Sequence, residues 1–486
     1  MVERAEAEAI YDAGREACVE FILGLAAEVG QHGDRLKRLE EQVRQDSRTS
    51  SRPPSMDPPK SRQQRRAEAR AKAKELARKE GERRKAGGQP GHRGAGRELK
   101  PEDQIDEIVD HYPEECGGCG RQFPVEQRTG GGRFGRHQVA ELPPISVIWT
   151  EHRTHQLRCR CCRARTSAQL PAAVAGSPFG TRLQAAIVAL TAAYRISRRG
   201  ITELARDLFG VTLATGTAEA ICQRASGALA GPYLHLQDVV LDQHAVHVDE
   251  TGWRTGGDGR ALWTATTSDL VLLQIAEHCN REQFNALIGT GYSGIVISDR
   301  WNGFSHLDPT RRQVCWSHIQ RDFRRHADGL AEQKSFGEKG VPLVARLFAA
   351  WRAYQHQHHD RARLQEEIAP VQTELRALLE AASPKKARNR WHRQFANNLL
   401  KVWPALWTFV TVDGVEPTNN PAERSLRAPV IHRKLSHGTR SNDGERFAER
   451  ALSAAGTCRL QHRSLFAYLS DLIAADTRGD PFPQLA

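Results

Sequence analysis

Four short apolar segments between residues 245 and 300 constrain the fold most. AVHVDE, ALWTATTS, LVLLQIA and GIVISD have the length and residue types of buried strands. REQFNALIG, which lies between the last two, has the spacing of a helix. The predicted order is therefore strand, strand, strand, helix, strand. Such an order indicates a sheet with helices packed on it, as in an α/β domain.

Three carboxylates stand out against this pattern. Asp249 lies in the first strand segment, Asp299 ends the last one, and Glu423 lies in PTNNPAERSLR. Each has an ordinary alternative: the aspartates as strand-end turns, and Glu423 at N3 of a capping box with Asn420 as N-cap and Pro421 at N1. Together, two acids on neighbouring strands and one on a helix can hold two divalent cations about 4 Å apart for phosphoryl transfer.

Positive charge is concentrated in one segment of the chain. The net charge is +12, and residues 60–100 hold fifteen Lys and Arg against five Glu. This segment is either a solvated tether or an arm that binds phosphates without sequence preference. The second interpretation makes DNA the expected partner.

Ten cysteines and the absence of a secretory pattern at the start favour a reducing compartment and metal binding. Two C-x-x-C pairs, Cys116 with Cys119 and Cys159 with Cys162, predict a structural Zn²⁺ site of four thiolates, with Cys161 as a competing ligand. The long segment between the pairs is expected to form its own hairpin. The alternative is a redox-active or incidental cysteine cluster.

Two further groups of residues are candidates for the site. Cys315 and His318 form a C-x-x-H pair, which is either a buried contact or a group that positions a metal-bound ligand or a DNA strand. Basic residues surround Glu423 and either grip phosphates or form a solvated face: Arg424, Arg427, Arg433, Lys434 and Arg440.

The rest of the chain indicates several modules. Apolar residues recur every seven positions in residues 15–45, which predicts either a dimerising coiled coil or a short intramolecular helix; they are Ile22, Val29, Leu36 and Val43, with Cys18, Leu25, His32 and Leu39. Residues 181–230 read as three helices, either a helix-turn-helix-like DNA-binding region or a plain bundle. No segment is apolar enough to span a membrane.

These segments give six predicted divisions. They are a helical segment at 1–46, a linker and basic arm at 47–104, a zinc-binding module at 105–172, a helical region at 178–235, a catalytic domain at 240–445 with a helical insertion at about 317–410, and a C-terminal helical element at 446–486.

The motifs occur in an order that resembles the transposases of the insertion-sequence-66 family, in the DDE transposase group. They are SSRPPS, GGQPGHRG, the two cysteine pairs, VDETGW, SDRWNGF, CWSHIQRDF and NNPAERSLRAPVIHRK. The resemblance covers the whole chain, including its last forty residues.

The resemblance implies a multidomain α+β protein with a ribonuclease-H-like catalytic core, in which Asp249, Asp299 and Glu423 hold two Mg²⁺ or Mn²⁺. It implies cleavage of the ends of a mobile element and strand transfer into target DNA. It also implies a dimer or higher oligomer, accessory proteins of the same element, and a bacterial cytoplasmic location at the nucleoid. The alternatives are a ribonuclease-H-like nuclease or junction resolvase without strand transfer, and a catalytically inactive zinc-dependent DNA-binding protein.

Overall fold

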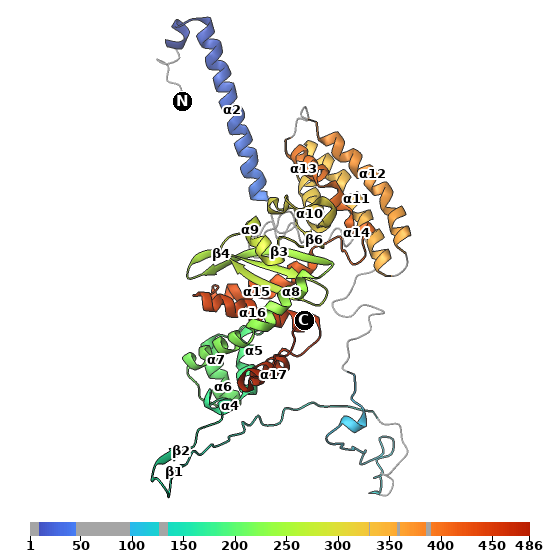
Figure 1. Ribbon diagram of the computed structural model, residues 1–486. Coiled ribbons are helices and arrows are strands. Elements are labelled where there is room, and N and C mark those ends of the chain that lie inside the picture. Colours follow the sequence, from blue (N-terminus) through green and yellow to red (C-terminus); the bar gives the residue numbers. More distant parts are fainter. Residues whose placement is uncertain (1–8, 45–97, 126–134, 330, 357–359, 385–389) are drawn as a thin grey trace. The chain divides into compact units, whose positions relative to one another are not determined.

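The computed structural model describes residues 9–44, 98–125, 135–329, 331–356, 360–384 and 390–486 (Figure 1). Most of the predicted linker and basic arm therefore lies outside the described residues. The chain divides into two compact units, Met1–Pro58 with Val147–Ala486, and Pro59–Ser146. Within the described part of the chain, no helix is both long enough and apolar enough to cross a bilayer.

The first long helix is α2, Arg15–Arg44, and it confirms the helix predicted there. Its predicted apolar seam faces solvent: the exposed fractions of Ile22, Leu25 and Val29 are 63%, 39% and 68%. Pairing of this seam into a coiled coil stays a prediction.

A mixed five-stranded sheet forms the centre of the larger unit, in the order β5-β4-β3-β6-β7. Strands β3, β4 and β5 are antiparallel neighbours, and β6 and β7 add in parallel to β3. The strands are β3 (Ala245–Thr255), β4 (Asp258–Thr266), β5 (Val271–Ala276), β6 (Ile295–Ser298) and β7 (Arg312–Val314). All four predicted strands are present, and the chain is mixed α+β with more helix than strand.

Helices cover both faces of this sheet. On one face, Leu426 of α15 and Leu452 of α16 join a buried cluster with Leu262 and other residues of the sheet. On the opposite face, Trp263 packs against Phe284 of α9. Figure 1 shows α9 on one side of the strands and α15 and α16 on the other. These helices are α9 (Arg281–Ile288), α15 (Asn420–Ser436) and α16 (Asn442–Leu460).

The helices before the sheet share one hydrophobic core with the C-terminal helices. The three helices predicted between residues 181 and 230 are confirmed, and α8 follows them without having been predicted. The elements of this region are α4 (Ala172–Ala175), α5 (Thr181–Ala192), α6 (Arg198–Phe209), α7 (Thr215–Ala228), α8 (Ala230–Leu241) and α17 (Leu465–Arg478). Apolar contacts between α5 and α17 therefore join the helices that precede the sheet to the C-terminal helices.

The segment predicted as a helical insertion is helical, and its helices share a hydrophobic core with Ile295, Ile297 and Val314 of the sheet. Its helices are α10 (Trp316–Ala327), α11 (Ala331–Gln355), α12 (Arg361–Ala382), α13 (Arg390–Lys401) and α14 (Thr408–Thr411). Helices α10 and α11 approach closely because glycines of α11 leave room for the backbone and aromatic rings of α10. A Cβ at Gly337 would lie 2.1 Å from the backbone nitrogen of Ala327.

Gly337→Ala is therefore expected to destabilise the protein by about 2 kcal/mol or more, because the rigid backbone of α10 cannot move aside. Gly216→Ala is the control, because nothing lies within 4 Å of a Cβ at that helical position; it should be neutral or slightly stabilising. Urea unfolding measures both. Equal midpoints for the two variants would contradict the close packing of α10 and α11.

His326 of α10 is a buried, neutral histidine. Its ring packs against Phe336 and Phe395, and its Nε2 has no hydrogen-bond partner among the residues that the structure describes. Burial, helped by the charge of Arg325, lowers the pKa of His326 to about 4 from 6.5. The unfolded chain therefore binds a proton between pH 6.5 and 4 that the folded chain does not, and stability is lost as the pH falls through this window.

His326→Phe should remove this dependence, because the phenyl ring fills the same space and does not titrate. Between pH 7 and pH 5 the free energy of unfolding of the variant should fall by about 2 kcal/mol less than that of the wild type. Urea unfolding at the two pH values measures the difference, with His152→Phe, at an exposed position, as the control. An equal fall in wild type and variant would contradict the assignment.

Candidate active site

Two of the three predicted acids lie side by side where the pairing of two parallel strands stops. Strand β3 pairs with β6 so that His247 lies opposite Ile297. Asp249 lies two residues further along, within β3, and Asp299 lies two residues after Ile297, directly after the end of β6. Neighbouring strands are about 4.8 Å apart, and residues two apart point to the same face. The register therefore brings the carboxylates of Asp249 and Asp299 together.

The third acid, Glu423, is brought to the same place by the start of α15. Asn419 immediately precedes this helix and is fully buried. Its Nδ2 donates a hydrogen bond of 2.8 Å to the carbonyl oxygen of Val248, and its Oδ1 lies 3.3 Å from Nδ1 of His247. The side chain of Asn419 thus fastens the start of α15 to β3 beside Asp249, and Glu423 lies in the first turn that follows.

The capping-box alternative for Glu423 is wrong. The helix begins at Asn420, and its N-cap is Asn419, whose side chain makes no capping hydrogen bond. Glu423 is the fourth helical residue, one position beyond N3 of a capping box. The helix also continues through Pro429 to Ser436. Because α15 is this long, the basic residues that follow Glu423 lie on the same helix at increasing distance from the acids.

The pKa values of the acids reflect both burial and the nearness of other carboxylates. Burial, together with the negative charges of Glu250, Asp299 and Glu423, raises the pKa of Asp249 to about 8. Burial and Asp299 raise the pKa of Glu250 to about 7. Glu250 was not among the predicted acids, because strand alternation places it on the face opposite to that of Asp249. The signal by which it could have been found is its adjacency to Asp249 in VDET.

Three buried polar atoms at this place have no hydrogen-bond partner in the described part of the chain: Oε1 of Glu423, Nδ1 of His318 and Oε2 of Glu250. Buried polar atoms are normally paired, so such a concentration indicates a site for a ligand. The carboxylate oxygens suit hard divalent cations such as Mg²⁺. The residues present therefore fit the cations that the sequence predicts.

Cys315 and His318, the C-x-x-H pair, lie beside Glu423. Cys315 is buried, and the ligand atoms of Cys315, His318 and Glu423 lie within 4.8 Å of one another. Nδ1 of His318 is 3.7 Å from Oε1 of Glu423, and Nη2 of Arg321 is 3.5 Å from the same oxygen. Arg321 follows His318 by one helical turn, which is the signal by which it could have been found.

The predicted basic residues lie on α15. Arg424 and Arg427 are exposed, Lys434 is exposed near the end of the helix, and Arg433 is half-buried with its Nη1 3.4 Å from Oγ1 of Thr251. The structure thus places Arg433 over β3, several residues beyond the acids. Arg440 follows the helix and is exposed.

Comparison with known proteins decides the family. The model of the transposase IS66 family matches residues 176–446, a span that holds the sheet, the insertion and all three acids. The chain belongs to the transposase IS66 family. Residues 2–98 of the chain match a second model, that of a family of unknown function.

One relative of the transposase comes from Sinorhizobium fredii and is called "uncharacterized protein y4hP". It is 25% identical over 203 residues, which are 38% of this chain and 37% of the relative. The match thus spans little more than a third of the relative's length.

Each of the two C-x-x-C pairs lies in a turn between backbone segments that hydrogen-bond to one another. Around the first, the backbone nitrogen of Cys116 donates to the carbonyl oxygen of Arg121, and Glu115 bridges to Gln122. Around the second, the backbone nitrogen of Cys159 donates to the carbonyl oxygen of Ala164. The flanking strands are β1 (Gln156–Arg158) and β2 (Arg165–Ser167). The expected hairpin between the knuckles is not found at 123–125 or 135–155; the paired segments enclose the knuckles themselves.

Both cysteine turns favour the deprotonated, thiolate form of their first cysteine. Backbone amides of Gly118 and then Cys119 lower the pKa of Cys116, and those of Cys162 and Cys161 lower the pKa of Cys159. The thiolate is the form of cysteine that binds zinc. The amide of Cys161 thus supports Cys159 in the structure; whether its thiol competes as a ligand stays a prediction.

Proposed function

We propose that this transposase cleaves DNA at the ends of a mobile element and joins the cut ends to target DNA, with Asp249, Asp299 and Glu423 as its catalytic acids. The observation that carries the proposal is the convergence of these acids from β3, β6 and α15. Three antiparallel strands followed by two parallel ones, with β3 in the middle, support a ribonuclease-H-like core for the catalytic domain.

Asp249 and Asp299 would hold two Mg²⁺ or Mn²⁺ ions, and Glu423 would complete the site. Cations bound there supply charge stabilisation to the attacking and leaving oxygens on phosphorus. Burial first, and then the neighbouring carboxylates, raise the pKa of Asp249 in the absence of a cation. A buried carboxylate beside other acids is stabilised by a bound cation.

The residues around the acids would position the DNA. Arg424 and Arg427 are exposed cations close to the acids in sequence and can contact phosphates directly. Arg321 lies against Glu423 and would orient its carboxylate. Asn419 acts as a positioning residue, since it holds the helix that carries Glu423 against β3.

The other modules would recognise and pair the element ends. We assign a structural Zn²⁺ to Cys116, Cys119, Cys159 and Cys162, and DNA contacts to the helices between residues 178 and 235. The exposed seam of α2 would join two copies of the chain, because two ends must be held together for joining. Accessory proteins of the same element and a location at the nucleoid follow from the same proposal.

A joining assay on supercoiled plasmid tests the function. Purified transposase with element-end DNA and Mg²⁺ should give products in which the end is covalently joined to the plasmid. Nicked or linear products without joining would favour a nuclease or junction resolvase. DNA binding with neither product would favour an inactive DNA-binding protein.

A further inference from the structure

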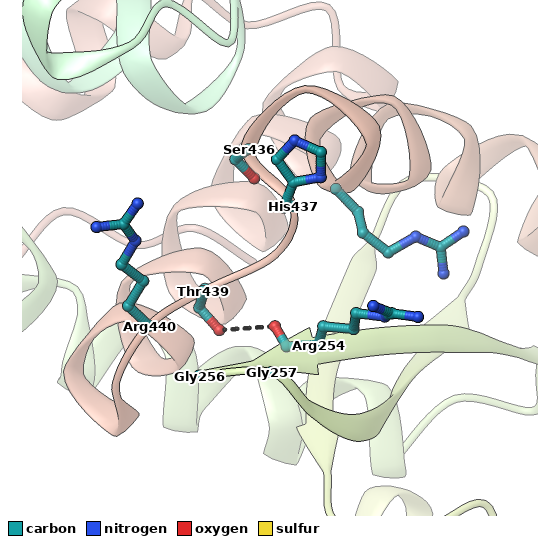
Figure 2. A pocket seen from close by; sticks show the side chains of 8 residues that line it. Arg254, Gly256, Gly257, Ser436, His437, Thr439 and Arg440 are labelled. Atoms are coloured by element: carbon teal, nitrogen blue, oxygen red, sulfur yellow. Dashed lines mark hydrogen bonds between the residues drawn. The ribbon is translucent and has the colours of Figure 1, made fainter.

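A positively charged cavity lies apart from the acids, where β3 and α15 end. Its volume is about 660 Å³. One wall is the tip of the hairpin between β3 and β4, residues 254–257, and the other is formed by residues 433–440. Figure 2 shows Arg254 and Arg440 extending to opposite sides of Thr439. We call this cavity the arginine pocket.

Backbone hydrogen bonds hold the two walls of the arginine pocket together. The nitrogen of Thr439 donates to the carbonyl oxygen of Arg254 at 2.9 Å, and the nitrogen of Gly256 donates to the carbonyl oxygen of Thr439 at 3.0 Å. Gly438 permits this approach, because a Cβ there would lie 2.1 Å from the oxygen of Arg254. The pocket is therefore formed before any ligand arrives.

The positive charges of the arginine pocket are not neutralised by the protein. Among the described residues, no carboxylate lies within 4.0 Å of the guanidinium of Arg254, Arg433 or Arg440. Glu445, the acid behind the hairpin, already accepts a hydrogen bond from Thr255 and lies 3.5 Å from Arg260. Unpaired guanidinium groups on a fixed scaffold attract an anion with several oxygens, above all a phosphate.

The close approach of the arginines adds to this attraction. Burial lowers the pKa of Arg433, and the positive charge of Arg254 lowers it further. The two cations therefore repel one another until an anion lies between them. The hairpin tip beside them has no side chains, since Gly256 and Gly257 form its turn at φ of 62° and 106°. A DNA backbone can approach this bare turn closely.

We propose that the arginine pocket binds the phosphodiester backbone of the substrate DNA at a distance from the cleaved bond. The inference rests on the proposed function, since it assigns this pocket to the same DNA. Five strand residues from Asp249 to Arg254 span about 17 Å, and ten helical residues from Glu423 to Arg433 span about 15 Å. The guanidinium of Arg433 reaches back to Thr251, two residues from Asp249, so at about 3.4 Å per base pair the pocket covers about two to five base pairs from the acids.

The test compares two triple variants that remove equal charge. Arg254→Gln/Arg433→Gln/Arg440→Gln empties the arginine pocket. Arg346→Gln/Arg363→Gln/Arg376→Gln is the matched control, because each of these arginines already pairs with a glutamate of the insertion. Binding to a fluorescent duplex is measured in EDTA at several salt concentrations, so that cleavage does not interfere. Circular dichroism checks the folding of both.

The pocket variant should lose about two phosphate contacts. The slope of log affinity against log salt concentration should become less steep by about 1.8. At 0.1 M salt this change in slope corresponds to about a 60-fold loss of affinity. The control should keep the slope of the wild type, and lysine at the three pocket positions should restore it. A slope unchanged in the pocket variant, while the wild type binds DNA, overturns the pocket alone. Absence of DNA binding by the wild type overturns the proposed function with it.

Discussion

Asp249→Asn is expected to abolish DNA cleavage while making the metal-free protein more stable. The amide keeps the shape of the side chain but cannot supply an anionic ligand, so cleavage should fall by at least about 10³-fold. Stability moves the other way because the folded state holds Asp249 among other carboxylates, with its pKa raised from 3.8 to about 8. Stability that is present below pH 3.8 is therefore lost as the pH rises through 8.

The stability gain should depend on pH in a defined direction. At pH 8 without metal, the free energy of unfolding of Asp249→Asn should exceed that of the wild type by on the order of 3 kcal/mol. At pH 5 the difference should be smaller, because the wild-type carboxyl of Asp249 is then protonated. Thermal unfolding in EDTA and single-turnover cleavage in Mg²⁺ measure the two effects. Asp471→Asn, at an exposed position on α17, is the control. Cleavage within tenfold of the wild type would exclude Asp249 as a catalytic acid.

Replacing one cysteine pair is expected to have the second large effect. Cys159→Ser/Cys162→Ser should reduce bound zinc from one ion per chain to none, because zinc sites of four thiolates bind with about 10–16 kcal/mol. Since binding and folding are coupled in such modules, residues 105–172 should become sensitive to protease in the same variant. Elemental analysis after dialysis, followed by limited proteolysis, measures both.

Cys161→Ser is the matched control for the zinc prediction. It changes the neighbouring exposed thiol, Cys161, while leaving both C-x-x-C pairs intact, so zinc content and protease resistance should stay at the wild-type level. Loss of zinc in this variant would instead make Cys161 a ligand. Wild-type protein without zinc, expressed in zinc-supplemented medium, would contradict the assignment of the whole module.

Much of the sheet could be predicted because its strands are buried and therefore apolar. Val246 and Val248 alternate with polar residues in β3, and β6 is buried throughout and apolar except for Ser298, so their patterns give both the strands and the positions of the two aspartates. Strand β7 was missed because it is short and holds Arg312 and Gln313, which are buried polar residues. The guanidinium of Arg312 donates to the carbonyl oxygen of Asp299 at 2.6 Å, a long-range contact that no local pattern carries.

The composition of the site could be predicted only in part. The three acids were found as separate candidates, but what brings Glu423 to the aspartates is the buried side chain of Asn419, which bonds to residues more than 170 positions away. Sequence spacing does not contain such a contact. Helix α15 passes Pro429 because packing of Leu426 against the sheet offsets the lost backbone hydrogen bond. Local rules favoured a short helix there, and tertiary packing overrode them.

The most direct test of the catalytic assignment is a crystal structure of the transposase soaked in Mn²⁺, with anomalous scattering used to locate the ions. We predict two Mn²⁺ ions bound by the carboxylates of Asp249, Asp299 and Glu423, and none there in crystals of Asp249→Asn. Mn²⁺ bound elsewhere, with these three carboxylates empty, would contradict the proposed two-metal site.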